Sequence, residues 1–435
     1  MKINISYTFS LLLLPWFVSA QDTVEIGISE VLSRVGERNQ TLRINELEYQ
    51  AARAQYRQTQ AAFLPQVSVA HTGTRTNNPV FAFGGKLNQG VFNQSDFDVD
   101  ALNNPAAISN FTTNIEIKQP LINVDAYMQR AALKNRTAAQ NLQNKYSAAA
   151  QKLEAKKAYM QLQLAYKAQE VLEKARRTAQ AHQAVSQDFF KEGIISKAQA
   201  LQASLRVAEV EEKLAEARAN VGNASDYLHF MMNAEAGELY RPTDSLMPVT
   251  YQAGRTETLP QTSDVVAMDR AQEARKDMWN AQKTDFLPTL NAFGNYQLFD
   301  NDVFQGGSNN YLVGVQLKWD LFKGSARLGK MQETKAKYQK ARLESEQYQS
   351  KKAMEIKKVY RNLQKLRLQL QTQKIAVAQA RESLRIMAQR YRQQLEKTAD
   401  LQAAETTLQE KELRYAQSIF NFNYTSAYYQ FLTQE

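Results

Sequence analysis

Proline is absent from two very long stretches of this sequence, residues 121–241 and 289–435. Because proline breaks helix interiors and both stretches are rich in Ala, Gln, Lys, Leu and Glu, they are predicted to form long helices. Their apolar residues recur at steps of three and four, which is typical of coiled coils. The two clearest series are Val207, Val210, Leu214, Ala217, Val221, Ala224, Leu228 and Met231, and Val359, Leu363, Leu366, Leu370, Val377, Ala380, Leu384, Met387 and Tyr391.

Each stretch is predicted to fold as a hairpin of two helices. Gly193 suits the position after a helix, and Ser196 with Gln199 suits a capping box that starts the next one. The first helix is roughly 100 Å long at about 1.5 Å per residue, which a compact domain does not need. The expected helices are about 125–191 and 196–233 in the first hairpin, and about 325–393 and 398–432 in the second.

Strands are predicted beside the long helices. Apolar and polar residues alternate over Phe111–Ile117 and over Tyr311–Trp319, which indicates strands with one apolar face. Each strand has an earlier partner, so two hairpins are expected. The four strands are about 63–75, 110–121, 286–299 and 310–321, and the segment 76–110 is expected to be a long loop.

The chain is predicted to be an internal duplication. The tripeptide Phe63–Pro65 recurs as Phe286–Pro288, and the series helix, strand, strand, helix, helix occurs twice. We therefore expect a first repeat at 21–233, a connecting segment at 234–263 and a second repeat at 264–435.

The first twenty residues are interpreted as a secretory signal peptide. Lys2 precedes an apolar stretch, and Val18-Ser19-Ala20 has the small residues of a cleavage site. A buried N-terminal helix is the alternative. The apolar stretch is too short to span a bilayer as a helix. The rest of the sequence contains no apolar stretch of about 18 residues.

The four strands have the length and alternation of outer-membrane strands. Four strands do not close a barrel, and lipid does not tolerate an open sheet edge. Copies of the chain would therefore have to assemble, giving eight strands as a dimer or twelve as a trimer. A soluble β-sandwich is the alternative, but it explains neither the export signal nor the long hairpins.

The sequence resembles the TolC-type outer-membrane efflux family over essentially all of its mature length. The resemblance rests on the ordered, duplicated set of Glu48–Arg57 followed by Ala62–Pro65, its echo before Phe286, and Trp319–Gly324 at the start of a long helix. It implies an α+β membrane protein with a trimeric TolC-like fold, in which a 12-stranded β-barrel lies in the outer membrane and a helical tunnel crosses the periplasm.

The resemblance also implies a function. The protein would be the exit duct of a tripartite efflux pump or a type I secretion system, and would pass small toxic compounds or secreted polypeptides. Its partners would be two further copies of itself, a periplasmic adaptor protein, an inner-membrane RND or ABC transporter and outer-membrane lipid.

The resemblance further implies roles for residues at the hairpin tips. Asp400 matches the aspartate ring of the periplasmic constriction, and Tyr391 matches a tyrosine that holds the closed state. Three positions depart from the family pattern, because Ala403 replaces a second aspartate, Glu396 an arginine and Gln394 the glycine of the turn. In the first repeat the equivalents of Tyr391 and Asp400 are Phe190 and Gln199. The closing network is therefore expected to differ in detail.

Simpler roles for these residues remain open. Asp400 in the first turn of a helix would be stabilised by the helix dipole, and Tyr391 continues the heptad series and could serve packing alone.

The tips around Gly193, Gln199 and Gln394 are also expected to dock the adaptor, with Leu201 and Leu401 as exposed or seam contacts.

No residue pattern supports catalysis. The chain has no Cys and three isolated His, at positions 71, 182 and 229, so we predict no enzyme activity, cofactor or metal site. The net charge is +10, but the Lys and Arg residues are scattered among Glu, Gln and Ala and do not form blocks. No nucleic-acid partner is therefore expected. The alternative function is an exported coiled-coil adaptor or structural rod of the cell envelope, which would explain the heptads but not the strands.

Overall fold

The computed structural model describes residues 23–235, 237–251, 254 and 258–434. The predicted signal peptide, residues 1–20, lies outside this part of the chain. The protein divides into two compact units, each of which is described here by itself. Unit 1 takes its described residues from Met1–Leu42, Ala148–Thr256 and Ile356–Thr433, and unit 2 from Arg43–Ser147, Glu257–Glu355 and Gln434–Glu435.

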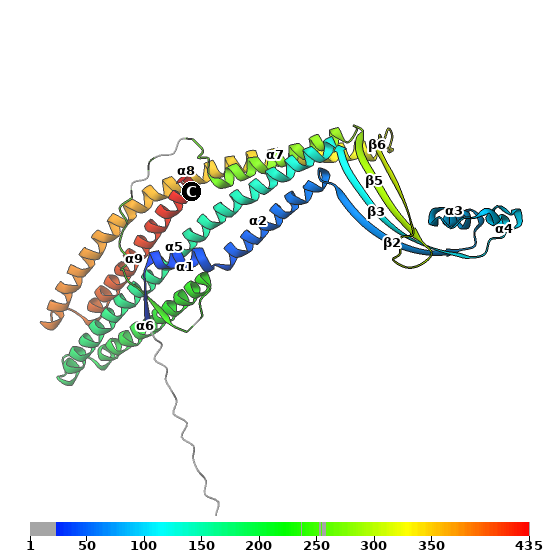
Figure 1. The fold of residues 1–435 in the computed structure, drawn as a ribbon. Helices are drawn as coiled ribbons and strands as arrows, with labels where there is room; N and C mark the ends of the chain where they lie inside the picture. Colours follow the sequence, from blue (N-terminus) through cyan, green and yellow to red (C-terminus); the bar gives the residue numbers. More distant parts are fainter. Residues whose placement is uncertain (1–22, 236, 252–253, 255–257, 435) are drawn as a thin grey trace, which may run out of the picture. The chain divides into compact units, whose positions relative to one another are not determined.

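Unit 2 contains a four-stranded antiparallel sheet in the order β2-β3-β5-β6 (Figure 1). The predicted hairpins are confirmed, because β2 pairs with β3 and β5 pairs with β6. The two hairpins join through β3 and β5, which leaves β2 and β6 as the edges. The strands are β2 (Gln66–Thr76), β3 (Ile108–Ile122), β5 (Thr289–Asp300) and β6 (Ser308–Lys318).

The segment between β2 and β3 differs from the predicted loop, because it contains two α-helices and a 3-10 helix. Asn78 caps the first of these helices by accepting hydrogen bonds from the backbone N–H groups of Val80 and Phe81, and Pro79 fixes its first turn. The sequence analysis did not predict these short helices, because the segment is rich in Asn, Gly and Asp, which favour turns. They are α3 (Pro79–Gln89), η2 (Gln94–Phe97) and α4 (Val99–Asn103).

Helices complete unit 2. A buried ion pair links two of them, because Lys352 Nζ on α8 lies 2.5 Å from Asp264 Oδ1 on α7. The hydroxyl of Tyr348, also on α8, donates to the other carboxylate oxygen at 2.5 Å. The elements are α2 (Gln40–Gln58), η1 (Thr59–Ala62), α7 (Ser263–Thr284) and the first parts of α5 (Val124–Lys191) and α8 (Ala326–Arg392).

Unit 1 contains the remaining lengths of the long helices and a small parallel sheet of two strands (Figure 1). Its core is apolar, with Leu162, Leu228 and Met232 fully buried beside Val31 and Val35. The strand β4 lies within the connecting segment, where no strand was expected. The elements are β1 (Thr23–Ile26), α1 (Ile28–Arg38), α6 (Lys197–Met232), β4 (Leu239–Pro242), α9 (Thr398–Gln434) and the later parts of α5 and α8.

Within the described residues, no helix is both long enough and apolar enough to cross a membrane.

Candidate functional site

The candidate site is the pair of turns at the ends of the two helical hairpins of unit 1. Both turns place one residue in the left-handed region, Gly193 at φ 72° and Gln394 at φ 62°. Both also close with the same pair of backbone hydrogen bonds, in which Gly193 and Ile194 donate to Phe190 and Phe189, while Gln394 and Leu395 donate to Tyr391 and Arg390. The two helical hairpins therefore have the same turn, although only the first has glycine there.

Hydrogen bonds at the first turn fix the start of α6. Ser196 is the N-cap, and its side chain accepts from the backbone N–H of Gln199 at 3.3 Å. The Gln199 side chain accepts in return from the Ser196 backbone N–H at 2.9 Å. This is the capping box that the sequence predicted.

Tyr391 lies at the centre of a small hydrogen-bonded group. Its ring is only 2% exposed, and its hydroxyl lies 2.8 Å from Ser186 Oγ on α5 and 3.3 Å from Thr398 Oγ1 on α9. The Phe189 ring packs against it, with centroids 5.6 Å apart. Tyr391 therefore connects the last turn of α8 with α5 and α9, and it combines packing and hydrogen bonding in one side chain.

The other predicted tip residues differ in exposure. Asp400 is exposed in the first turn of α9. Leu201 is 58% exposed, whereas Leu401 is 1% exposed and packs inside the seam. Of these two leucines, only Leu201 presents a surface to a partner.

Glu396 pairs with an arginine of its own hairpin. Its carboxylate lies 2.7 Å from Arg390 Nε, across the turn. The charge of Glu396 is therefore neutralised within its own hairpin.

Sequence reasoning missed a buried polar cluster behind the turns. His182 Nδ1 on α5 is hydrogen-bonded to the Glu405 carboxylate on α9, and Glu405 also lies 3.8 Å from Arg206 Nε on α6. Arg206 donates to Gln409 Oε1 at 2.7 Å. His182 and Glu405 are 223 positions apart, so no local spacing pointed to the pair.

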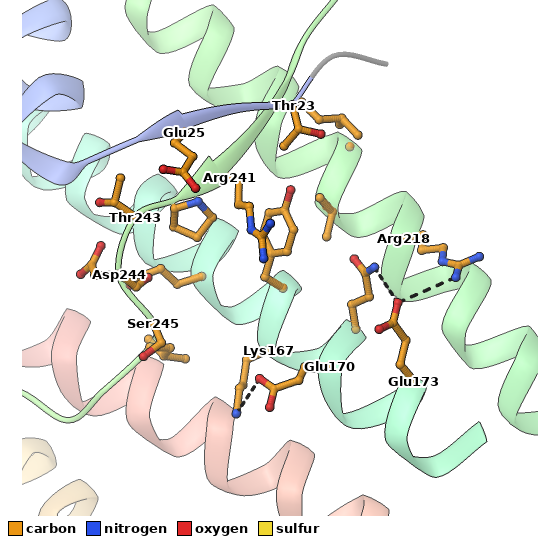
Figure 2. A pocket seen from close by; sticks show the side chains of 18 of the residues that line it. Thr23, Glu25, Lys167, Glu170, Glu173, Arg218, Arg241, Thr243, Asp244 and Ser245 are labelled. Carbon is orange, nitrogen blue, oxygen red and sulfur yellow. Dashed lines mark hydrogen bonds and ion pairs between the residues drawn. The ribbon is translucent and has the colours of Figure 1, made fainter. Parts of the chain in front are cut away.

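A separate cleft of about 1130 Å³ lies in unit 1 (Figure 2). Its walls carry ion pairs, with Lys167 Nζ 2.8 Å from Glu170 Oε2 and Arg218 Nη2 3.8 Å from Glu173 Oε1. Among the described residues, no group of three or more His, Cys, Asp or Glu could hold a metal ion. We assign no ligand to this cleft.

The comparisons with known proteins agree with this architecture. A model of the outer membrane efflux protein family matches residues 31–234 and 255–419. No curated protein matches the sequence.

Several solved structures share the fold. CusC is 18% identical, with a TM-score of 0.80, and the match covers 94% of this chain and 92% of that one. The CmeC outer membrane channel of Campylobacter jejuni is 14% identical, with a TM-score of 0.79 and 93% and 85% coverage. VceC, an outer membrane protein of Vibrio cholerae, is 16% identical, with a TM-score of 0.77 and 94% and 97% coverage.

The fold and the matches define an outer-membrane channel with a helical tunnel that extends into the periplasm. The chain belongs to the outer membrane efflux protein family, which confirms the resemblance to TolC-type proteins. It is an exit duct for efflux across the outer membrane, and the rod alternative is not favoured. This family and fold are those of channel proteins rather than of enzymes.

Proposed function

We propose that three copies of this chain form one duct. The observation that carries the proposal is the four-stranded sheet. Its edge strands, β2 and β6, are each paired with a strand on one side only among the described residues. Three sheets joined edge to edge give a 12-stranded barrel in outer-membrane lipid, which leaves no edge open.

The apolar side chains on β6 support this arrangement. Tyr311, Val313, Val315 and Leu317 recur at every second position and are each at least 62% exposed. Alternation of this kind gives a strand one apolar face that can meet lipid, while the intervening residues line a watery lumen.

We also propose that the two repeats predicted from the sequence are the building blocks of this duct. The series α2, β2, β3, α5, α6 is followed by α7, β5, β6, α8, α9, with 234–263 connecting them. Removal of residues 1–20 on export would give the mature chain.

The periplasmic end of the duct would be controlled at the hairpin tips. Three copies of Asp400 would form an acidic ring, and Tyr391 would hold the closed state through Ser186 and Thr398. The proposal is supported by the exposure of Asp400 and the burial of Tyr391.

The same tips would bind the other components of the pump. A periplasmic adaptor would dock around Gly193, Gln199 and Gln394, with Leu201 as an exposed apolar contact. An inner-membrane RND or ABC transporter would supply the energy, and the chain itself would catalyse no reaction.

The experiment that tests the proposal is the protein mass of the mature chain in detergent, measured by light scattering on a size-exclusion column. We expect three chain masses, and precipitation when the detergent is removed. A monodisperse monomer or dimer that needs no detergent would overturn the shared barrel and restore the envelope rod.

A further inference from the structure

The register of the sheet identifies the face that lines the proposed lumen. Residues paired across neighbouring strands lie on the same face, and Ile117 on β3 pairs with Gly294 on β5, which pairs with Val313 on β6. Because Val313 belongs to the apolar face of β6, Ile117 and the other odd-numbered residues of β3 face lipid as well. The even-numbered residues of β3, which include Ile108 and Asn110, therefore lie on the inner face.

The helix α3 packs against this inner face. The segment that contains it precedes β3, which runs into α5 at its other end, so α3 lies at the end of the sheet away from the helical tunnel (Figure 1). Gln89 Nε2 donates to Asn110 Oδ1 at 2.9 Å and to the carbonyl oxygen of Asp300 at 3.2 Å. A Cβ at Gly85 would lie 2.6 Å from Ile108 Cδ1, so the backbone of α3 comes close to the sheet there. The helix therefore covers the lumen side of the wall at the extracellular end.

The segment that holds α3 has a small core of its own. The Phe92 ring packs edge-on against two others, with centroids 4.9 Å from Phe83 and 5.1 Å from Phe97. Lys86 is the one charged residue of α3, and its Nζ lies 2.6 Å from Asp96 Oδ1. These contacts hold α3 in a defined position and neutralise its charge.

The side of α3 that points away from the wall is apolar. Ala82, Gly85 and Gln89 are buried and form the row that faces the sheet. Helical spacing places Val80 and Leu87 on the opposite side, where they are 76% and 49% exposed. Since the buried row faces the wall of the lumen, Val80 and Leu87 face the axis of the proposed barrel.

The lumen has room for three such helices and little else. Twelve strands about 4.8 Å apart and tilted by about 40° give a barrel roughly 24 Å across between backbones. An α-helix with its side chains is about 10 Å thick. Three copies of α3, one on each third of the wall, therefore fill most of this cross-section and bring their apolar sides together near the axis.

We propose that α3 from three copies forms an apolar constriction at the extracellular mouth of the duct. The inference rests on the proposed trimer. A narrow passage lined by Val80 and Leu87 offers no hydrogen bonds to water, so it dewets and blocks ions and polar solutes. Solutes with an apolar surface replace that water with favourable contacts, and the constriction therefore favours apolar cargo.

A cysteine near the axis tests whether the three helices meet, because the natural chain has no Cys. Leu87→Cys in the full-length protein should form covalent dimers on oxidation, since any two of three neighbouring thiols can join. Asn114→Cys is the matched control on the inner face of β3. Its three copies would lie on the wall about 20 Å apart, beyond disulfide reach, and should stay uncoupled.

The reactivity of a thiol below the constriction tests whether the mouth is closed. Asn114→Cys is exposed to an anionic maleimide dye that does not pass general porins, added outside cells that carry the protein in their outer membrane. It should react at least tenfold more slowly than Asp100→Cys, which is exposed on α4 in front of the constriction.

Two changes should open the mouth and raise the rate of the thiol on β3 at least tenfold. One is Val80→Asn with Leu87→Asn, which makes the constriction polar. The other replaces residues 77–107 by residues 301–307, the short turn of the second hairpin. Val303→Asn is the control, because this valine is 49% exposed in that turn and does not belong to α3. It should leave the rate unchanged.

Light scattering on the same proteins in detergent separates the two proposals. A trimer in which Leu87→Cys stays uncoupled, or in which the asparagine pair leaves the rate of the inner thiol unchanged, overturns the constriction while the proposed duct stands. A monomer in detergent overturns both.

Discussion

At the scale of single residues, the two hairpin turns show how one backbone shape is made from different side chains. Gly193 and Gln394 both have positive φ, which glycine adopts freely and glutamine does not. A Cβ at Gly193 would meet no atom within 4 Å, so only backbone conformation distinguishes the two positions.

Exchanging these residues should therefore have opposite effects. Gln394→Gly is expected to stabilise the second turn by about 1 kcal/mol, and Gly193→Gln to destabilise the first by a similar amount. Hydrogen exchange of the turn amides in the detergent-solubilised protein measures both. Equal protection in the two variants and the natural protein would contradict the argument.

The Tyr391 hydroxyl is the second residue-scale feature. Tyr391→Phe removes its bonds to Ser186 and Thr398 and should cost about 1 kcal/mol of stability. It should also raise the open probability of the channel in planar bilayers. Ser186→Ala completes a double-mutant cycle with Tyr391→Phe. The double variant should lose less stability than the sum of the losses of the two single variants. Strict additivity would show that the two hydroxyls do not interact.

At the scale of elements, the buried pair of Lys352 and Asp264 holds α8 against α7. Burial opposes ionisation of Asp264, but hydrogen bonds from Lys352, Thr262 and Tyr348 outweigh it and hold the pKa of that carboxyl below its ordinary value. Burial and the neighbouring Asp264 raise the pKa of Tyr348. The group is thus an ion pair with a neutral tyrosine donor.

The pair gives a prediction with a defined pH dependence. Lys352→Met should cost about 3 kcal/mol at neutral pH, because it leaves a buried carboxylate without its cation. Since the folded-state pKa of Asp264 is depressed, its contribution in the natural protein is present above the unfolded pKa and is lost as the pH falls below about 4. The difference between the two proteins should therefore narrow in acid.

Thermal unfolding at several pH values measures this difference. Lys351→Met is the matched control, since Lys351 is the exposed neighbour on the same helix. A loss of stability that is equal for Lys352→Met and Lys351→Met, or that is independent of pH, would refute a specific role for the ion pair.

Two strand glycines make room for aromatic rings across the sheet. Gly73 faces Phe111, and Gly314 faces Phe293. A Cβ at Gly73 would lie 2.6 Å from Phe111 Cε1, and one at Gly314 would lie 2.9 Å from Phe293 Cζ. Each hairpin thus covers a glycine on its edge strand with a ring on its central strand.

Substitution at these glycines should displace the rings. Gly73→Ala and Gly314→Ala are expected to cost about 1–3 kcal/mol through overpacking. Gly294→Ala is the control, because a Cβ there would lie 3.6 Å from Val313 Cγ1, an ordinary contact. The urea midpoint of the refolded protein measures the effect. If Gly294→Ala lowers this midpoint as much as the other two substitutions do, overpacking against the rings is not the cause.

At the scale of the whole molecule, Asp400 gains its proposed importance only from symmetry. One exposed carboxylate at a helix N-terminus is stabilised by the helix dipole and does little else. Three of them around an axis would form a ring that favours cations.

Asp400→Asn should therefore reduce cation selectivity and block by divalent cations in planar-bilayer recordings, while Asp400→Glu should retain both. The pair separates charge from shape, because asparagine keeps the shape and glutamate keeps the charge. Unchanged currents in Asp400→Asn would remove the acidic ring from the mechanism.

The sequence alone determined the long helices, the strand pairs and the family. These depend on local properties, namely the absence of proline, the heptad series and the alternation of apolar residues, which neighbouring residues already specify. The capping box at Ser196 was predictable for the same reason. The helices between β2 and β3 were missed because turn-forming residues dominate that segment.

Only the tertiary structure decided which distant side chains meet. Three pairs join residues between 88 and 223 positions apart, namely His182 with Glu405, Lys352 with Asp264, and Tyr391 with Ser186. Helical periodicity gives the face on which a residue lies, but the height and the neighbour are set by packing between helices. The contacts that would hold and open this duct are therefore properties of the packed molecule.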